Sequence, residues 1–125
     1  MNDAQAPTLI HRFWQLANQR QWSDFATLLH PKVIYTVPQT RERVCGCDGF
    51  VDFFATWPGN WTVHVNVQIA DDKQAVTRFD FVDESGTVTG MSFFEFADGL
   101  ITKIVDYWPD SYEPPPRLSS HVERY

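Results

Sequence analysis

The sequence predicts an α+β fold, with helices in the first part of the chain and an antiparallel sheet in the second. Apolar residues recur at helical spacing up to residue 57, and at every second position from residue 61 onward. Turn residues separate the later apolar runs at regular intervals. A length of 125 residues suits a single domain, so we assign residues 1–125 to one unit.

Three helices are expected before residue 60. The first starts near Pro7, and a shorter one spans Trp22 to Leu29 before His30-Pro31 ends it. Asp48 is the expected N-cap of the third helix, which Pro58-Gly59 terminates. A short strand over 33–37 is expected between the second and third helices.

Four strands are expected after residue 60. Residues 61–69 alternate between apolar and polar side chains, and a turn at Asp71-Asp72-Lys73 leads to a strand over 75–82. A turn around Glu84-Ser85-Gly86 leads to the last two strands, which meet at Asp98-Gly99, a strong hairpin signal. Residues 109–125 follow as a proline-rich arm, which we expect either to lie over its own domain or to reach a partner.

Composition excludes several classes of function. The net charge of −6 makes a nucleic-acid partner unexpected, since no basic stripe is present to neutralise phosphates. No apolar run approaches the roughly 20 residues of a membrane span, and no signal pattern is seen, so a cytoplasmic protein without a membrane partner is expected. Cys45, Cys47 and the four histidines lack metal-ligand spacing, and no cofactor motif accompanies the aromatic residues. We therefore expect neither a metal nor a cofactor.

Turn lengths predict which side chains share a face of the sheet. A two-residue turn at Asp98-Gly99 pairs Met91 with Asp106, and a turn at Ser85-Gly86 pairs Asp80 with Met91. One face would then carry Arg78, Asp80, Met91, Phe93, Glu95, Ile104, Asp106 and Trp108. The opposite face would carry Phe79, Phe81, Phe94, Phe96, Ile101, Val105 and Tyr107.

This register predicts a row of three charged side chains, Arg78, Asp80 and Asp106, on neighbouring strands. An arginine between two carboxylates can leave one poised as a base and the other as an acid. Such a row in an apolar cavity would be a usable acid–base unit. The alternative is a structural network of ion pairs across strands.

Two segments carry a resemblance to a known family: Phe94-Glu95-Phe96-Ala97-Asp98-Gly99-Leu100-Ile101 and Val105-Asp106-Tyr107-Trp108. Through them the chain resembles the SnoaL-like branch of the nuclear transport factor 2 (NTF2)-like superfamily, which includes polyketide cyclases, ketosteroid isomerases and limonene epoxide hydrolase. The resemblance implies a cone-shaped fold, with three N-terminal helices on a curved, mostly antiparallel sheet. It also implies a pocket between helices and sheet and a homodimer formed through the convex sheet face.

The residue pattern is most similar to that of limonene epoxide hydrolase, through Arg78-Phe79-Asp80, Asp106-Tyr107 and Tyr35. The resemblance implies that Asp106 activates water, Asp80 protonates the epoxide, Arg78 bridges the two acids and Tyr35 holds the water. Val37 departs from the pattern, which has a water-binding Asn there, because Val cannot hydrogen-bond a water.

Two hypotheses follow. The first is a cofactor-independent acid–base enzyme acting on a small apolar molecule, by epoxide hydrolysis or by cyclase- or isomerase-like proton transfer with Asp106 as the base. The second is a non-catalytic ligand-binding or dimerisation module of the same fold. The pocket-lining residues expected are Trp14, Phe54, Met91, Phe93, Ile104 and Trp108.

Overall fold

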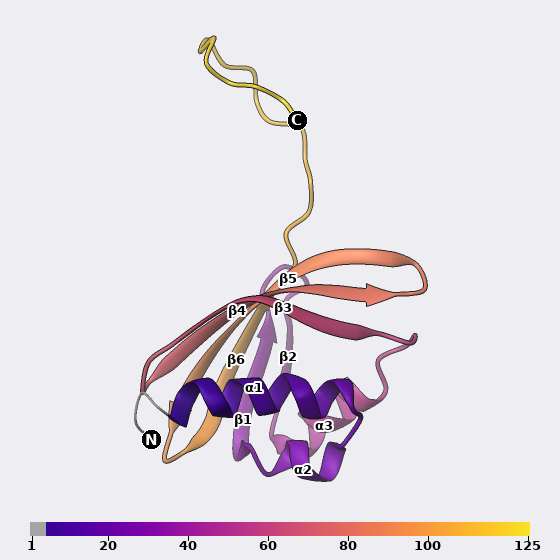
Figure 1. The fold of residues 1–125 in the computed structure, drawn as a ribbon, viewed down its shortest axis with the longest axis vertical. Coiled ribbons are helices and arrows are strands. Elements are labelled where there is room, and N and C mark those ends of the chain that lie inside the picture. The colour runs from indigo at the N-terminus through magenta and orange to yellow at the C-terminus, as the bar shows by residue number, and fades with distance from the viewer. Residues whose placement is uncertain (1–4) are drawn as a thin grey trace.

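The computed structural model describes residues 5–125 as three helices packed against one face of a six-stranded sheet (Figure 1). The helices are α1 (Gln5–Asn18), α2 (Trp22–Ala26) and α3 (Cys47–Ala55). The strands are β1 (Leu29–Val37), β2 (Glu42–Cys45), β3 (Thr62–Ala70), β4 (Gln74–Asp83), β5 (Gly86–Ala97) and β6 (Leu100–Tyr107). They lie in the order β2-β1-β6-β5-β4-β3, and β1 and β6 are the parallel pair. The predicted α+β class and mostly antiparallel sheet are confirmed.

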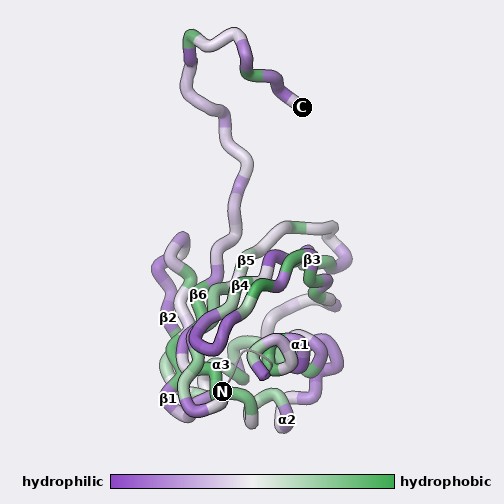
Figure 2. Tube along the Cα trace, turned by 60° about the vertical axis from the view of Figure 1, so that its left-hand side comes forward, coloured by the Kyte–Doolittle hydropathy of each residue, from purple (hydrophilic) through white to green (hydrophobic). Residues whose placement is uncertain are grey.

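The core lies between the helices and the inner face of the sheet. Helix α1 buries Ile10, Phe13, Trp14 and neighbouring small residues, as its helical spacing predicts. The ring of Phe13 contacts Phe94 of β5 edge-on, with centroids 5.2 Å apart. Hydrophobic segments of helices and strands face one another across this layer (Figure 2). No helix within residues 5–125 is long and apolar enough to cross a membrane.

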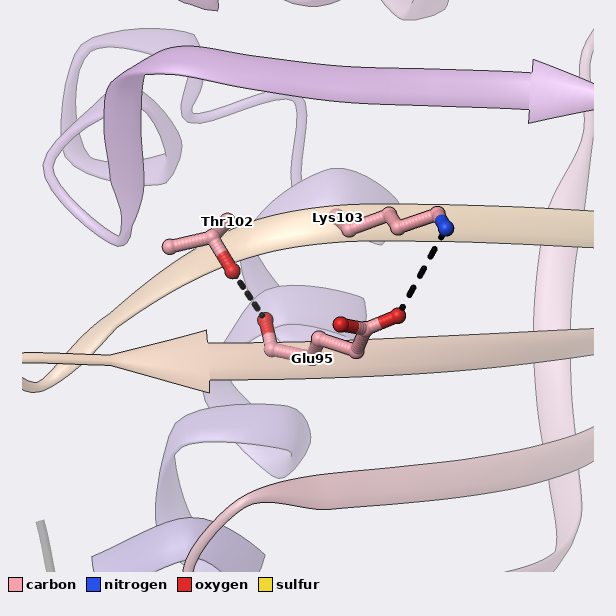
Figure 3. A network of polar contacts seen from close by, with 3 residues as sticks. All are labelled: Glu95, Thr102 and Lys103. Atoms are coloured by element: carbon pink, nitrogen blue, oxygen red, sulfur yellow. Dashed lines mark hydrogen bonds and ion pairs between the residues drawn. The ribbon is translucent and has the colours of Figure 1, made fainter.

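A β-bulge near the start of β6 decides which β6 side chains point into the core. The turn pairs Ala97 with Leu100, as predicted, but the register shifts by one residue at Thr102. The Thr102 hydroxyl donates to the backbone carbonyl of Glu95 at 3.1 Å, and Lys103 forms an ion pair with the Glu95 carboxylate (Figure 3). An extra residue on one strand reverses the facing of every later side chain. Asp106 therefore pairs with Ser92, not with Met91 as predicted.

Residues beyond the bulge lie on the face opposite to the one predicted. Ile104 and Asp106 are buried on the inner face, and Trp108 packs against the core from that side. Conversely, Val105 and Tyr107 lie on the outer face. On β4 and β5 the predicted faces are correct, although the turn is at Glu84-Ser85 and the pairing moves by two residues. A shift of two residues preserves the facing of side chains, whereas the shift of one at Thr102 does not.

The other differences concern the ends of elements. Helix α2 stops at Ala26, and the expected terminator Pro31 lies within β1, where the pairing with β6 is irregular between Leu29 and Ile34. A proline is compatible with a strand at such an irregularity, because no ladder hydrogen bond is required of it there. Gly46, not Asp48, is the N-cap of α3, and β2 was not predicted.

Candidate functional site

A pocket of about 110 Å³ lies between the helices and the inner face of the sheet. Its walls are mostly aromatic and include Trp57, which is 46% exposed. Asp106 contributes the buried carboxylate and is 3% exposed. The lining residues are Trp14, Tyr35, Val37, Thr40, Glu42, Phe53, Phe54, Trp57, Trp61, Val63, Phe79, Phe81, Asp106 and Trp108.

Three adjacent strands bring the polar group together. Tyr35 comes from β1, Asp106 from the neighbouring β6, and Ser92 from β5 on the other side. The Tyr35 hydroxyl donates to Asp106 Oδ2 at 2.6 Å, and the Ser92 hydroxyl donates to Oδ1 at 2.5 Å. Both carboxylate oxygens therefore have a donor, and Asp106 is held in one orientation beside the pocket.

Burial governs the protonation of this group. Removal from water disfavours the charged form and raises the pKa of Asp106 to about 6, against the lowering effect of the hydrogen bonds from Ser92 and Tyr35. The pKa of Tyr35 is also raised, first by burial and then by the negative charge of Asp106, so Tyr35 stays protonated and remains a donor. A carboxyl group with a pKa near neutrality can both accept and return a proton at physiological pH.

The walls of the pocket are fixed by contacts behind them. The Trp14 indole N–H donates to the buried Thr77 hydroxyl at 3.2 Å. The Arg20 guanidinium lies 3.8 Å from the centre of the Trp61 ring and donates to the Trp61 carbonyl. Gln39 binds both the backbone N–H and the carbonyl of Trp108. These contacts fix the orientation of the tryptophans that line the cavity.

The predicted charged row does not form, because the bulge places Asp106 on the inner face. Arg78 is exposed on the outer face and pairs in the sheet with Met91 and Val67. Asp80 lies on the same outer face, where it accepts a hydrogen bond from Asn66 at 3.4 Å. The structure therefore brings Tyr35 and Asp106 together and leaves Arg78 and Asp80 on the other side of the sheet.

Some of the residues predicted to line the pocket do so, and others do not. Trp14, Phe54 and Trp108 line the cavity, as does Val37 at the position where the resemblance calls for an Asn. Met91 and Phe93 do not, because they lie on the outer face, where Phe93 is 44% exposed. Ile104 is buried in the core next to the site without lining it.

Sequence reasoning missed Ser92, and no motif marks it. Its role depends on pairing with Asp106, which the bulge creates. Gly90 was also missed. A Cβ there would lie 2.5 Å from Phe79 Cζ and 2.9 Å from Trp108 Cζ3, so only glycine lets both rings pack over β5. Within residues 5–125, no group of three His, Cys, Asp or Glu side chains is placed to hold a metal ion.

Comparisons with known proteins agree with this architecture. A SnoaL-like domain model matches residues 10–104. A crystal structure named "putative ketosteroid isomerase", from Kribbella flavida DSM 17836, is 34% identical with a TM-score of 0.91, covering 98% of this chain and 91% of that one. A "putative polyketide cyclase" from Xanthomonas campestris pv. campestris is 19% identical with a TM-score of 0.76, covering 87% and 93%.

An NTF2-like protein of unknown function from Burkholderia xenovorans LB400 is 18% identical with a TM-score of 0.78, covering 95% of this chain and 94% of its own. The last two structures share the fold alone at this level of identity, whereas the first is a closer relative. A search of curated proteins found no match. The domain match and the Kribbella relative together show that this chain belongs to the SnoaL-like family, with the NTF2-like fold.

Proposed function

We propose that this protein is a cofactor-independent acid–base enzyme that moves a proton on a small apolar carbonyl compound, with Asp106 as the base. The observation that carries the proposal is the buried Asp106 carboxyl group, which lies beside an apolar pocket and has a pKa of about 6. The names of the Kribbella and Xanthomonas relatives, an isomerase and a cyclase, belong to the same class of chemistry.

In this mechanism the Asp106 carboxylate removes a proton from a carbon next to the substrate carbonyl and returns it to another position. Tyr35 and Ser92 hold the two carboxylate oxygens and limit the rise in the pKa of Asp106, so that part of the protein carries the reactive carboxylate at neutral pH. The aromatic walls exclude water, which strengthens the base toward a bound C–H group.

The lining narrows the expected substrate class. The indole N–H of Trp14 is already bonded to Thr77, and the Tyr35 hydroxyl to Asp106, so neither of these donors is free to stabilise an enolate oxygen. We therefore expect a substrate whose C–H bond is already acidic, such as a 1,3-dicarbonyl or β,γ-unsaturated ketone. The cavity of about 110 Å³ is smaller than the cavities of about 150 Å³ that accept benzene, so we expect a substrate with no more than about one six-membered ring inside it.

Epoxide hydrolysis by the three-residue arrangement is less well supported, because Arg78 and Asp80 face away from Asp106. The pocket lining contains Asp106 and the exposed Glu42, but no arginine that would bridge two acids.

The test is proton exchange and isomerisation followed by NMR in D₂O. The probes are 2-methyl-1,3-cyclohexanedione and 3-cyclohexenone, with cyclohexene oxide as the epoxide probe and a steroid enone precursor as a probe of size. Enzyme-dependent exchange on the one-ring ketones that Asp106→Asn abolishes supports the proposal. Binding of these probes with no exchange would favour the non-catalytic module, and epoxide opening that requires Arg78 would restore the hydrolase hypothesis.

A further inference from the structure

The pocket contains a second carboxylate that the proposed mechanism does not use. Glu42 of β2 lies directly opposite Val37 of β1, and residues paired in this way share a face of the sheet. Val37 is buried on the inner face, so the Glu42 side chain lies on that face too, and both residues line the pocket. Glu42 is exposed, whereas Asp106 is buried. The lining therefore combines a carboxylate in contact with water and a carboxylate removed from it.

The charge of Glu42 has no partner in the domain. Within residues 5–125, the Glu42 side chain forms no hydrogen bond and no ion pair. Arg43 follows it in the chain but pairs with Thr36, so alternation along β2 places Arg43 on the outer face. Arg41 lies in the turn before β2 and does not line the pocket. The negative charge is therefore available to a ligand.

This charge acts on the interior of the pocket. Burial raises the pKa of the Tyr35 hydroxyl, the charge and hydrogen bond of Asp106 raise it further, and the negative charge of Glu42 adds to them. Among the lining residues that the structure describes, none is Lys, Arg or His. The net charge of −6 also attracts cations toward the protein from solution. The electrostatic field in the pocket therefore favours a positively charged ligand and opposes an anion.

The aromatic walls favour the same sign of charge, because the face of an aromatic ring attracts a cation within about 6 Å of its centre. The ring of Trp61 is already occupied, by Arg20 at 3.8 Å and by Phe81, which stacks on it at 5.7 Å. Phe53 and Trp57, with ring centroids 5.5 Å apart, have no such cation within residues 5–125. Trp57 is also 46% exposed, so a ligand can reach its ring.

We propose that the substrate of this pocket carries an ammonium group, which Glu42 binds together with the rings of Phe53 and Trp57. The carbonyl-bearing part of the substrate then lies toward Asp106. This inference rests on the proposed function, because it adds a charged group to the carbonyl compound named there. Glu42 is the residue that selects the charge of the substrate, and compounds that carry a phosphate or carboxylate group are rejected.

An ammonium group on the substrate also supplies what the lining lacks for the reaction. Negative charge develops on the substrate as Asp106 removes the proton, and a nearby positive charge stabilises it. The Trp14 N–H and the Tyr35 hydroxyl already have acceptors, so neither of them serves this purpose. The substrate itself brings the positive charge, which makes its C–H bond more acidic.

The first test compares three one-ring ketones that differ in charge: 4-aminocyclohexanone, 4-hydroxycyclohexanone and 4-oxocyclohexanecarboxylate. Binding is followed by NMR through the indole N–H signals of ¹⁵N-labelled protein. The four tryptophans that line the pocket should shift, and Trp22, which does not line it, is the internal control. The ammonium probe should bind at least about threefold more tightly than the hydroxyl probe, and the carboxylate probe most weakly. Equal affinities, a preference for the carboxylate, or no shift with the ammonium probe would overturn the inference.

The second test assigns the preference to Glu42. Glu42→Gln should raise the Kd of the ammonium probe by about two- to fivefold and leave that of the hydroxyl probe unchanged. Glu95→Gln is the matched control, because Glu95 is an exposed glutamate on the outer face and its loss changes the net charge equally. An unchanged Kd in Glu42→Gln, or an equal effect of Glu95→Gln, would contradict the assignment.

Binding is measured without turnover, so this inference and the proposed function can fail separately. A preference for the ammonium probe that depends on Glu42, with no proton exchange on any ketone, would reject the reaction and leave an ammonium-binding module. Proton exchange that Asp106→Asn abolishes, with no preference among the three probes, would support the reaction and overturn the inference.

Discussion

The substitution Asp106→Asn removes the buried carboxylate beside the pocket, and we expect it to stabilise the protein at neutral pH. The folded state raises the pKa of Asp106 from 3.8 to about 6. Ionising the group in the folded protein is therefore unfavourable, and the stability of the wild type falls as pH rises from about 4 through 6. Asn is neutral throughout and can keep both hydrogen-bond partners, because Ser92 and Tyr35 can each donate or accept.

The size of the effect follows from the pKa. One unit of pKa is about 1.4 kcal/mol, so the difference between 3.8 and about 6 corresponds to roughly 3 kcal/mol. Because the unfolded chain is already partly ionised near pH 4, we expect the stability of Asp106→Asn relative to wild type to increase by roughly 2–3 kcal/mol between about pH 4 and 7.5. In thermal unfolding this is on the order of 10 °C.

Urea unfolding of both proteins at the two pH values measures this difference directly. Asp80→Asn is the matched control, because Asp80 lies on the outer face with a single long hydrogen bond to Asn66. The control should show little pH-dependent change. A gap between Asp106→Asn and wild type that is the same at both pH values, or a variant less stable at neutral pH, would refute the reasoning about burial.

Two further predictions concern Tyr35 and Gly90. Tyr35→Phe removes the donor to Asp106 Oδ2 and should raise the pKa of Asp106 further, so the acidic limb of the pH–rate profile should move upward by about one pH unit. Tyr107→Phe, on the outer face, is the control and should leave the profile in place. An unshifted profile for Tyr35→Phe would contradict the role of Tyr35 as a donor to Asp106. Gly90→Ala should lower the free energy of unfolding by about 1–3 kcal/mol and weaken ligand binding, because the added Cβ would overlap Phe79 and Trp108. Calorimetry measures this loss, with Thr89→Ala as the control. A fully stable Gly90→Ala protein would show that the two rings can move freely.

Much of the architecture could be predicted because it depends on local signals. The helical spacing in α1 and the Asp98-Gly99 turn each lie within a few residues of the structure they specify. The side chains of β4 and β5 that share a face were predicted correctly, even though the turn between the strands was misplaced. The predicted pairing was displaced by two residues, and a displacement of two leaves every side chain on the same face. Tyr35 and Asp106 were both singled out from the sequence, but the hydrogen bond between them was not predicted.

The site itself could be predicted only in part, because one inserted residue decides which face of the sheet each later β6 side chain lies on. The Thr102 bulge is stabilised by a hydrogen bond to the β5 backbone, a contact between strands that no local pattern encodes. Because of this bulge, Asp106 shares its face of the sheet with Ser92, and not with Arg78 and Asp80 as predicted.

The sequence by itself determined the fold class and the family, and it named Tyr35 and Asp106 as candidates without predicting that they would meet. Periodicity and turn chemistry are properties of neighbouring residues, so they can be read along the chain. Only the tertiary structure decided which charged side chains face the pocket, because an offset of one residue moves all later side chains of a strand to the other face of the sheet. It also decided the pKa of Asp106, since that value depends on burial by residues from distant parts of the chain.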